Sequence, residues 1–162
     1  MQLWIALPPE VELGPTISIY QAPENVPEVG PARVLLGSYG SASSAITVPS
    51  PINYLAIRLK AGERWRYEPP TGHIVLWVAI VSGVLAAPDQ LSHGDLVAFQ
   101  PSSQAVEFEA LSDAEFVLGS AAPHEHDLVL GNYSVHTSPG ALRDGEAHIS
   151  SIRRRLVREG RL

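Results

Sequence analysis

Alternating apolar and polar positions characterise the middle of the chain. In the range 54–60, Leu55, Ile57 and Leu59 fall on one side of an extended backbone, with the period of two that a half-buried strand requires. The range 106–110 repeats this alternation. Both ranges therefore predict β-strands with one face in a core and the other face in solvent.

A longer apolar run lacks this alternation. Residues 73–81 are continuously apolar after the first position, which fits either a strand covered on both faces or a buried helix. The β-branched residues of the run and the Ser82–Gly83 pair that closes it favour a strand. Shorter apolar runs predict further strands at 96–99, 115–118 and 127–130. Many short strands separated by glycine and proline indicate an all-β sandwich, barrel or jelly roll.

The period of the apolar positions changes after residue 137. Ser138 is placed to cap a helix, and Pro139 is placed in its first turn. The apolar positions that follow at helical spacing are Leu142, Ile149, Ile152 and Leu156. We therefore predict a C-terminal amphipathic helix over 138–160. The arginines at 153–155 read as a solvated face near its end, where cations also complement the helix dipole.

Composition narrows the chemistry that this fold can carry. The length of 162 residues suits one well-cored domain. Because the chain has no cysteine, any metal site has to use His, Asp or Glu. The formal net charge of −6 argues against a nucleic-acid surface. No apolar run reaches the roughly 18 to 20 residues of a spanning helix, and the basic start of a signal peptide is absent, so we expect a cytoplasmic protein without a membrane contact.

Several segments share their order and sequence features with one known family. They are 2–8 (QLWIALP), 54–62 ending in KAG, 72–83, and 132–139 (NYSVHTSP). Together they resemble the C-terminal half of a pirin, a family with two cupin barrels. The resemblance implies an all-β double-stranded β-helix, the cupin jelly roll, with one C-terminal amphipathic α-helix. It implies a single cupin domain over 1–162, with an N-terminal segment and edge strands in 1–30, a β-barrel in 31–137 and the helix in 138–160.

The position of the first matching segment has a consequence for partners. In a pirin this segment lies mid-chain, after a metal-bearing N-terminal barrel, whereas here it follows Met1. The sequence is therefore either a natural single-cupin form or a domain cut from a longer one. Both leave open a surface that the first barrel would cover. We expect a homo-oligomer, a partner barrel or another protein there, with an apolar patch that includes Leu3, Trp4 and Ile5.

The resemblance also implies where a metal would be held. Cupins use two His that flank one residue, a Glu further along and a third His on a later strand, which together suit a divalent transition metal. The corresponding positions here, 69–72, Leu76 and about Val106, cannot coordinate, and the second barrel of pirins usually lacks the ligand set. We therefore predict no cofactor. The alternative is one divalent transition metal (Fe, Ni, Zn or Mn) at a site of His73, His124 and His126.

The hexapeptide 122–127, APHEHD, is the local signal for that alternative. In an extended conformation, the side chains of His124 and His126 face one side and Glu125 faces the other. Two imidazoles without a third ligand bind a transition metal only weakly, and the segment lies far from the motif positions. A polar turn is the preferred interpretation of this segment. The alternatives are a metal site and a role at a domain or subunit boundary.

These observations favour a non-catalytic, metal-free cupin that acts as a structural or protein-interaction domain. The enzyme alternative is a metal-dependent dioxygenase, because some pirins are quercetin-cleaving dioxygenases that depend on the metal of the first barrel. A third interpretation is a small-ligand binding barrel with Trp65, Tyr67 and His73 at its mouth. Against it, aromatic residues on a β surface are more often packing residues.

Overall fold

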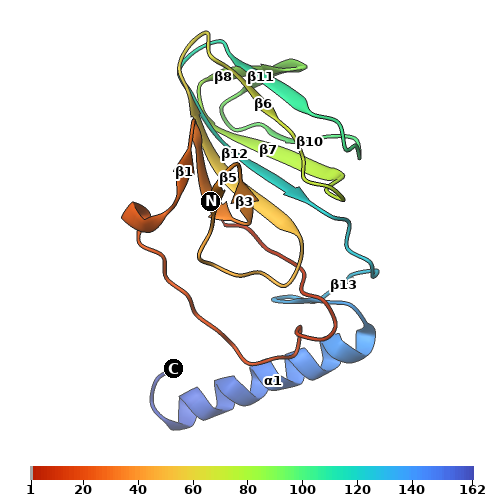
Figure 1. Ribbon diagram of the computed structural model, residues 1–162. Helices are drawn as coiled ribbons and strands as arrows, with labels where there is room; N and C mark the ends of the chain where they lie inside the picture. Colours follow the sequence, from red (N-terminus) through yellow and green to blue (C-terminus); the bar gives the residue numbers. More distant parts are fainter. Residues whose placement is uncertain (1) are drawn as a thin grey trace. The chain divides into compact units, whose positions relative to one another are not determined.

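The computed structural model describes residues 2–162, and the chain divides into two compact units (Figure 1). The larger unit is Ile19–Pro123, and the smaller unit combines the terminal segments, up to Ser18 and His124–Leu162. Strands dominate the larger unit, whereas the smaller unit carries the C-terminal helix. No helix within residues 2–162 is long and apolar enough to cross a membrane.

A six-stranded antiparallel sheet, here called the large sheet, forms one layer of the larger unit. Its strands in spatial order are β1 (Glu28–Val29), β2 (Ala32–Leu36), β5 (Ile52–Leu59), β12 (Ala114–Ala121), β7 (Val75–Ser82) and β10 (Leu96–Ala98). The long strands β5, β12 and β7 lie together at its centre. Apart from β1 and β2, neighbouring strands of this sheet are not consecutive in the sequence, a connectivity typical of a jelly roll rather than of a meander.

A four-stranded antiparallel sheet, here called the small sheet, forms the second layer. Its strands in spatial order are β6 (Arg64–Tyr67), β11 (Val106–Ala110), β8 (Val84–Ala87) and β9 (Asp89–Ser92). A short 3-10 helix η1 (Pro23–Asn25) and a hairpin of β3 (Ser38–Tyr39) and β4 (Ala42–Ser43) complete the unit. The chain passes from one sheet to the other at the β7–β8 corner, where Gly83 has a φ of 79° and a Cβ would overlap the backbone of Asp113.

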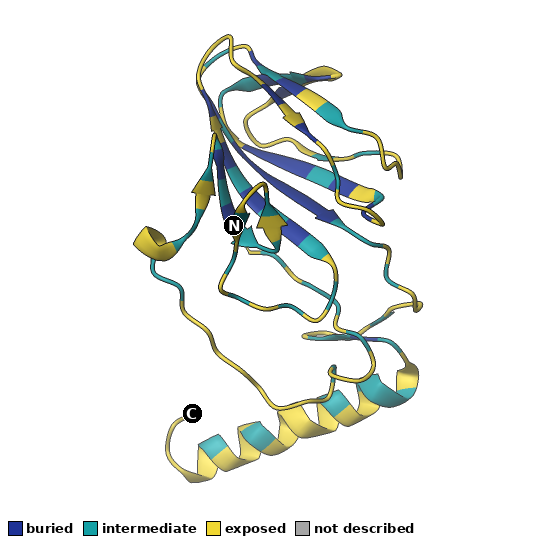
Figure 2. Ribbon diagram, in the orientation of Figure 1, coloured by how far each residue is buried: buried dark blue, intermediate teal, exposed yellow. Residues whose placement is uncertain are grey.

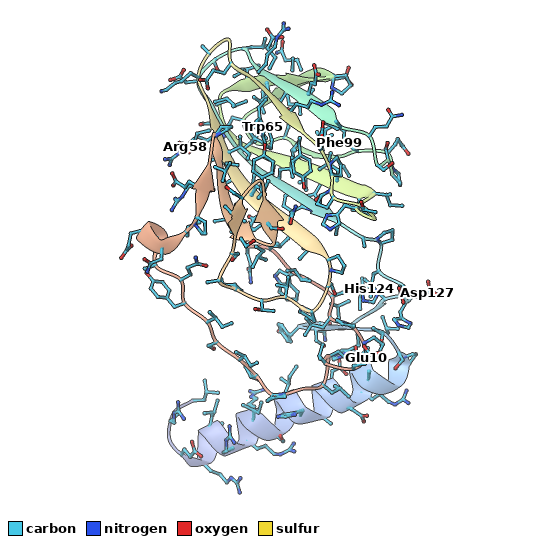
Figure 3. All side chains as sticks on the ribbon, viewed as in Figure 1. Glu10, Arg58, Trp65, Phe99, His124 and Asp127 are labelled. Atoms are coloured by element: carbon cyan, nitrogen blue, oxygen red, sulfur yellow. The ribbon has the colours of Figure 1, made fainter. Side chains whose placement is uncertain are left out.

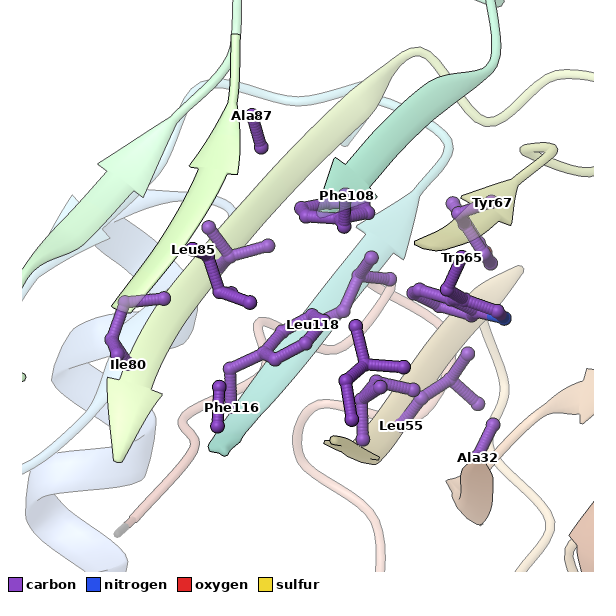
Figure 4. Close-up of a cluster of buried hydrophobic side chains, with 14 of the residues drawn as sticks. Ala32, Leu55, Trp65, Tyr67, Ile80, Leu85, Ala87, Phe108, Phe116 and Leu118 are labelled. Carbon is purple, nitrogen blue, oxygen red and sulfur yellow. The ribbon is translucent and has the colours of Figure 1, made fainter. Parts of the chain in front are cut away.

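Alternate residues of the strands fill the space between the two sheets (Figures 2 and 4). Leu55 and Phe116 enter this core from the large sheet, and Trp65, Tyr67 and Phe108 enter it from the small sheet. Ring centroids lie 5.2 Å apart for Phe108 and Phe116, and 5.6 Å apart for Trp65 and Phe108. These distances are within the range of favourable aromatic contacts, so the interior of the larger unit is a packed core.

The smaller unit combines a hairpin of β13 (Val129–Leu130) and β14 (Val135–His136) with the helix α1 (Pro139–Arg158). The side chain of Ser138 caps the helix by accepting a hydrogen bond of 3.1 Å from the Ala141 backbone N–H. The apolar side chains of α1 are half-buried or exposed, and none is buried. Among residues 2–162, every buried apolar side chain lies between Ala32 and Leu118, in the larger unit.

The strands predicted from alternation are confirmed as β5 and β11, and the continuously apolar run is confirmed as β7. The helix predicted over 138–160 spans Pro139–Arg158, with the predicted cap and the predicted first-turn proline. The run at 127–130 forms a strand only at Val129–Leu130, as part of a short hairpin. The all-β jelly roll with one C-terminal helix is confirmed, whereas the extent of a single cupin domain stays a prediction.

Candidate functional site

A chain of hydrogen-bonded polar side chains crosses one end of the core of the larger unit. Asn53 and Ser120 enter it from the large sheet, Tyr67 enters from the small sheet, and His73 precedes β7. The Tyr67 Oη lies 2.7 Å from the Ser120 Oγ, and the His73 Nδ1 lies 2.8 Å from the same Oγ. The Asn53 Nδ2 donates to the Tyr67 Oη at 3.1 Å. All of these residues are buried.

The direction of the hydrogen bonds in this polar chain follows from its first member. The backbone N–H of Ser38 donates to the Asn53 Oδ1 at 2.9 Å, which orients the amide so that its Nδ2 faces Tyr67. With the amide in this orientation, the Tyr67 hydroxyl is free to donate to Ser120, and the Ser120 hydroxyl is then free to donate to the His73 Nδ1. In this arrangement His73 is neutral, with its proton on Nε2. Burial also lowers the pKa of His73, which favours the same neutral form.

Trp65 and Tyr67, predicted at the mouth of a ligand-binding barrel, lie inside the core. Trp65 is 7% exposed and Tyr67 is fully buried, because both alternate with the exposed Arg64 and Arg66 along β6. The Trp65 Nε1–H donates to the Tyr39 Oη at 2.8 Å. Burial raises the pKa of Tyr67, and the hydrogen bonds with Ser120 and Asn53 offset this only in part. Both side chains thus face the opposite sheet instead of a rim, while a ligand-binding role for Trp65, Tyr67 and His73 stays a prediction.

A cleft of about 470 Å³ lies beside the Asn53 end of the polar chain. Its lining residues are Val29, Ser38, Tyr39, Gly40, Asn53, Arg66, Glu68 and Pro70. The Arg66 Nε lies 3.0 Å from a Glu68 carboxylate oxygen, so the charges at this cleft are paired. The cleft has both apolar and hydrogen-bonding walls, which is the composition of many small-ligand sites.

The segment 122–127 forms a bend in the smaller unit from His124 onward. The backbone N–H of His126 donates to the His124 Nδ1 at 3.2 Å, so His124 folds back onto the main chain. The two ring centroids lie 5.8 Å apart at an interplanar angle of 64°. Glu125, His126 and Asp127 are exposed (Figure 3 labels His124 and Asp127). This geometry is that of a polar turn.

Metal ligation in this chain would need a larger donor set than the turn offers. Within residues 2–162, no three or more His, Asp or Glu side chains gather in a group that could hold a metal ion. His73 belongs to the larger unit, whereas His124 and His126 belong to the smaller one. The joint site of these three histidines stays a prediction.

A buried carboxylate that the sequence analysis missed ties the N-terminal segment to the start of α1. Glu12 accepts hydrogen bonds from the Thr137 backbone N–H at 2.9 Å and from the Thr137 Oγ1 at 2.7 Å. The His136 Nδ1 lies 3.2 Å from the same carboxylate. Burial alone would raise the pKa of Glu12, but the hydrogen bonds from Thr137 and His136 outweigh it and lower the pKa. No local sequence pattern predicts this contact, because Glu12 and Thr137 lie 125 positions apart.

The architecture and the interior define an all-β protein of the cupin jelly-roll class. No protein-family model and no curated protein sequence matches the chain. Among solved structures, quercetin 2,3-dioxygenase from Acinetobacter baumannii is similar, with a TM-score of 0.79 and 19% identity over 90% of this chain and 53% of that chain. GK1651 from Geobacillus kaustophilus has a TM-score of 0.55 and 14% identity over 64% of this chain and 46% of that chain. The bacterial pirin YhhW from Escherichia coli, in complex with nickel(II), has a TM-score of 0.44 and 20% identity over 49% of this chain and 34% of that chain.

The similarities to the dioxygenase and to GK1651 show the fold. The predicted resemblance to a pirin-like cupin domain is confirmed at that level, and the chain spans about half the length of the dioxygenase that it matches, at 53%. Catalytic and non-catalytic proteins share the same folds, so the function has to be argued from the residues of this chain.

Proposed function

We propose that this chain is a non-catalytic, metal-free, pirin-like cupin that acts as a structural or protein-interaction domain. The observation that carries this proposal is the filled interior of the larger unit. Trp65 lies with its ring centroid 5.6 Å from Phe108 and 6.1 Å from Phe116, in the space between the two sheets. Because these rings occupy the interior, a substrate finds no room there.

The donor set of the interior supports the same proposal. The buried polar groups of the larger unit are the side chains of Asn53, His73 and Ser120, together with the hydroxyl of Tyr67. They bond to one another, and they include a single imidazole and no carboxylate. A divalent transition metal is held by several imidazoles and carboxylates with open positions for substrate, so these residues do not fit one.

The interaction role is supported by apolar side chains that remain in contact with solvent. Trp4, in the predicted patch, is 62% exposed, while Leu3 and Ile5 are half-buried. An exposed apolar surface of this kind suits a second copy, a partner barrel or another protein. The net charge of −6 does not suit a nucleic acid.

Transition-metal content and oxygenase activity test this proposal. Tag-free protein is analysed by mass spectrometry for Fe, Ni, Zn and Mn, beside the double variant His124→Ala/His126→Ala and the matched control His148→Ala on the exposed face of α1. We expect trace metal in all three proteins and no oxygen uptake with quercetin. Near-stoichiometric metal that is lost in the double variant but kept in the control, together with quercetin oxidation, would replace this proposal with the dioxygenase alternative.

The cleft beside Asn53 favours a second candidate, a small-ligand binding barrel. Tyr39 lines this cleft and accepts the Trp65 indole hydrogen bond, so a bound ligand should change the fluorescence of Trp65. A screen of flavonoids and metabolites on a Trp4→Phe background removes the signal of the exposed Trp4. A flat response across the screen would remove this candidate.

A further inference from the structure

The outer faces of the two sheets differ in their chemistry. On the small sheet, Arg64 and Arg66 of β6 lie in register with Glu109 and Glu107 of β11. The charged groups of these pairs meet at 2.8 Å and 3.3 Å. Cross-strand ion pairs are characteristic of a sheet face in contact with water. The outer face of the small sheet is therefore suited to solvent.

The outer face of the large sheet is apolar across its central strands. The central row of side chains crosses these strands as Ala56, Val117 and Ala79 and ends at Leu96 of the edge strand β10. The rows beside it contain Tyr54, Gly119, Trp77 and Ala98, and then Ile52, Ala121 and Val75. The inner face of the same sheet packs into the core. Sheets that are apolar on both faces normally have both faces covered by other structure. We therefore expect a binding partner on this outer face.

A glycine makes this outer face smooth. The indole ring of Trp77 lies so close to Gly119 that a Cβ at that position would overlap it. The ring centroids of Trp77 and Tyr54 lie 5.8 Å apart across the same row. The two aromatic side chains therefore lie down along the sheet instead of standing up from it, and a flat surface can approach them.

The outer face is exposed along β7 and β10 and carries no net charge. Leu96 is 72% exposed, and Val75 and Val81 are 40% and 44% exposed, whereas Val117 and Ala79 in the central row are buried. Arg58 and Glu115, at the end of the face, neutralise each other at 2.8 Å. A partner therefore does not need an opposite charge. A second copy of this acidic chain is not repelled by the face itself, and its remaining charges are screened beyond about 8 Å at physiological ionic strength.

We propose that two copies of this chain pair through the outer faces of their large sheets, with the row of Trp77 and Gly119 near the two-fold axis. A flat, neutral, apolar face is self-complementary, as an isologous interface requires. The six strands, two to eight residues long, contain 34 residues, and about 3.3 Å by 4.8 Å for each residue gives a face of about 540 Å² in projection. Stable dimers bury about 800 Å² of accessible surface per partner, and a corrugated sheet of this projected area supplies an area of that order.

This pairing rests on the proposed interaction role and names its surface and partner. It is tested by sedimentation velocity across micromolar concentrations of the full chain. The variants are Leu96→Glu and Val81→Glu, each of which places a charge on the proposed interface. Gln90→Glu is the matched control, because it adds the same charge on an exposed position of β9 in the small sheet.

The wild-type chain is expected to form a dimer in the micromolar range. Both interface variants should weaken it by more than about tenfold, because two-fold symmetry brings the introduced charges of both copies to one interface, while Gln90→Glu should leave it unchanged. A wild-type monomer at all concentrations, or a dimer that both interface variants leave intact, would overturn the proposal. Neither sedimentation result changes the outcome of the metal and activity test. The non-catalytic role can therefore hold with another partner when the dimer is absent, and it can fail when the dimer is present.

Discussion

Replacing Ser120 with alanine removes the central member of the buried polar chain. The Ser120 hydroxyl links the Tyr67 Oη at 2.7 Å and the His73 Nδ1 at 2.8 Å. In Ser120→Ala, both groups lose this partner while they remain enclosed by the core. A buried polar group left without a partner costs about 1–3 kcal/mol. Because the two groups can relax in part, we expect the free energy of unfolding to fall by about 2–4 kcal/mol.

Urea denaturation followed by circular dichroism measures this loss, with Ser103→Ala as the control at an exposed position. Tyr67→Phe removes the other hydroxyl, so the double variant Ser120→Ala/Tyr67→Phe should lose less than the sum of the two single variants, by about 1 kcal/mol. Nitrogen-15 NMR of His73 reports the same chain independently, since its Nδ1 should lose its hydrogen bond in Ser120→Ala. A cost for Ser120→Ala no larger than that of Ser103→Ala, or additive single variants, would refute the polar chain as a coupled unit.

Three further predictions concern packing and pH. Gly119→Ala places a methyl group where the Trp77 indole lies, and it should lower the unfolding free energy by about 1–3 kcal/mol in a thermal melt. Burial holds the pKa of His73 below its usual 6.5. Its contribution to the unfolding free energy is therefore full above pH 6.5 and is lost as the pH falls through the folded pKa. His73→Gln should remove this loss of unfolding free energy below pH 6.5. The pKa of Glu12 is lowered from 4.5, so its contribution is present above that pH and is lost below it; the stability gap between wild type and Glu12→Gln should close on acidification below pH 4.5, and a constant gap would contradict this.

The predictable parts of the fold are the elements in which buried and exposed positions repeat at a fixed period along the sequence. β5 and β11 were visible because Leu55, Ile57 and Phe108 face one core in alternation. The helix α1 was visible because Ser138 and Pro139 mark its start. The two-residue strands β1, β3 and β4 give no such repeat, since their pairing depends on tertiary contacts that a local window does not contain.

The alternation along β6 was also visible in the sequence, but the sequence did not show what its apolar face contacts. Arg64 and Arg66 alternate with Trp65 and Tyr67, which separates a polar face from an apolar one. Whether the apolar face lines an open mouth or a filled core depends on the opposite sheet, and in this protein Phe108 and Phe116 fill that space. The aromatic pair is therefore part of the packed core.

Two members of the candidate site, Tyr67 and His73, were named from the sequence, whereas Asn53 and Ser120 were not. His73 stands out beside an apolar strand, whereas Ser120 lies 47 positions further on and carries no motif of its own. A hydroxyl at the end of an apolar strand looks like a boundary residue until the strand pairing is known. The pairing of β5 with β12 places Asn53 opposite Ser120, and that register is what assembles the polar chain.

The two faces of the large sheet have different roles in these proposals. The inner face packs into the core and stabilises the fold, whereas the outer face is the proposed recognition surface. Ser120 and Leu118 point inward from β12, whereas Gly119 and Val117 point outward in the same strand. Loss of an inward polar bond should therefore lower the unfolding free energy and leave pairing between copies unchanged while the protein is folded. A charge at Leu96 should do the reverse, because this side chain is exposed in the single chain. Ser120→Ala and Leu96→Glu thus form a crossed pair: if both variants changed both stability and dimerisation, the two faces would not be independent and the assignment of the outer face to recognition would fail.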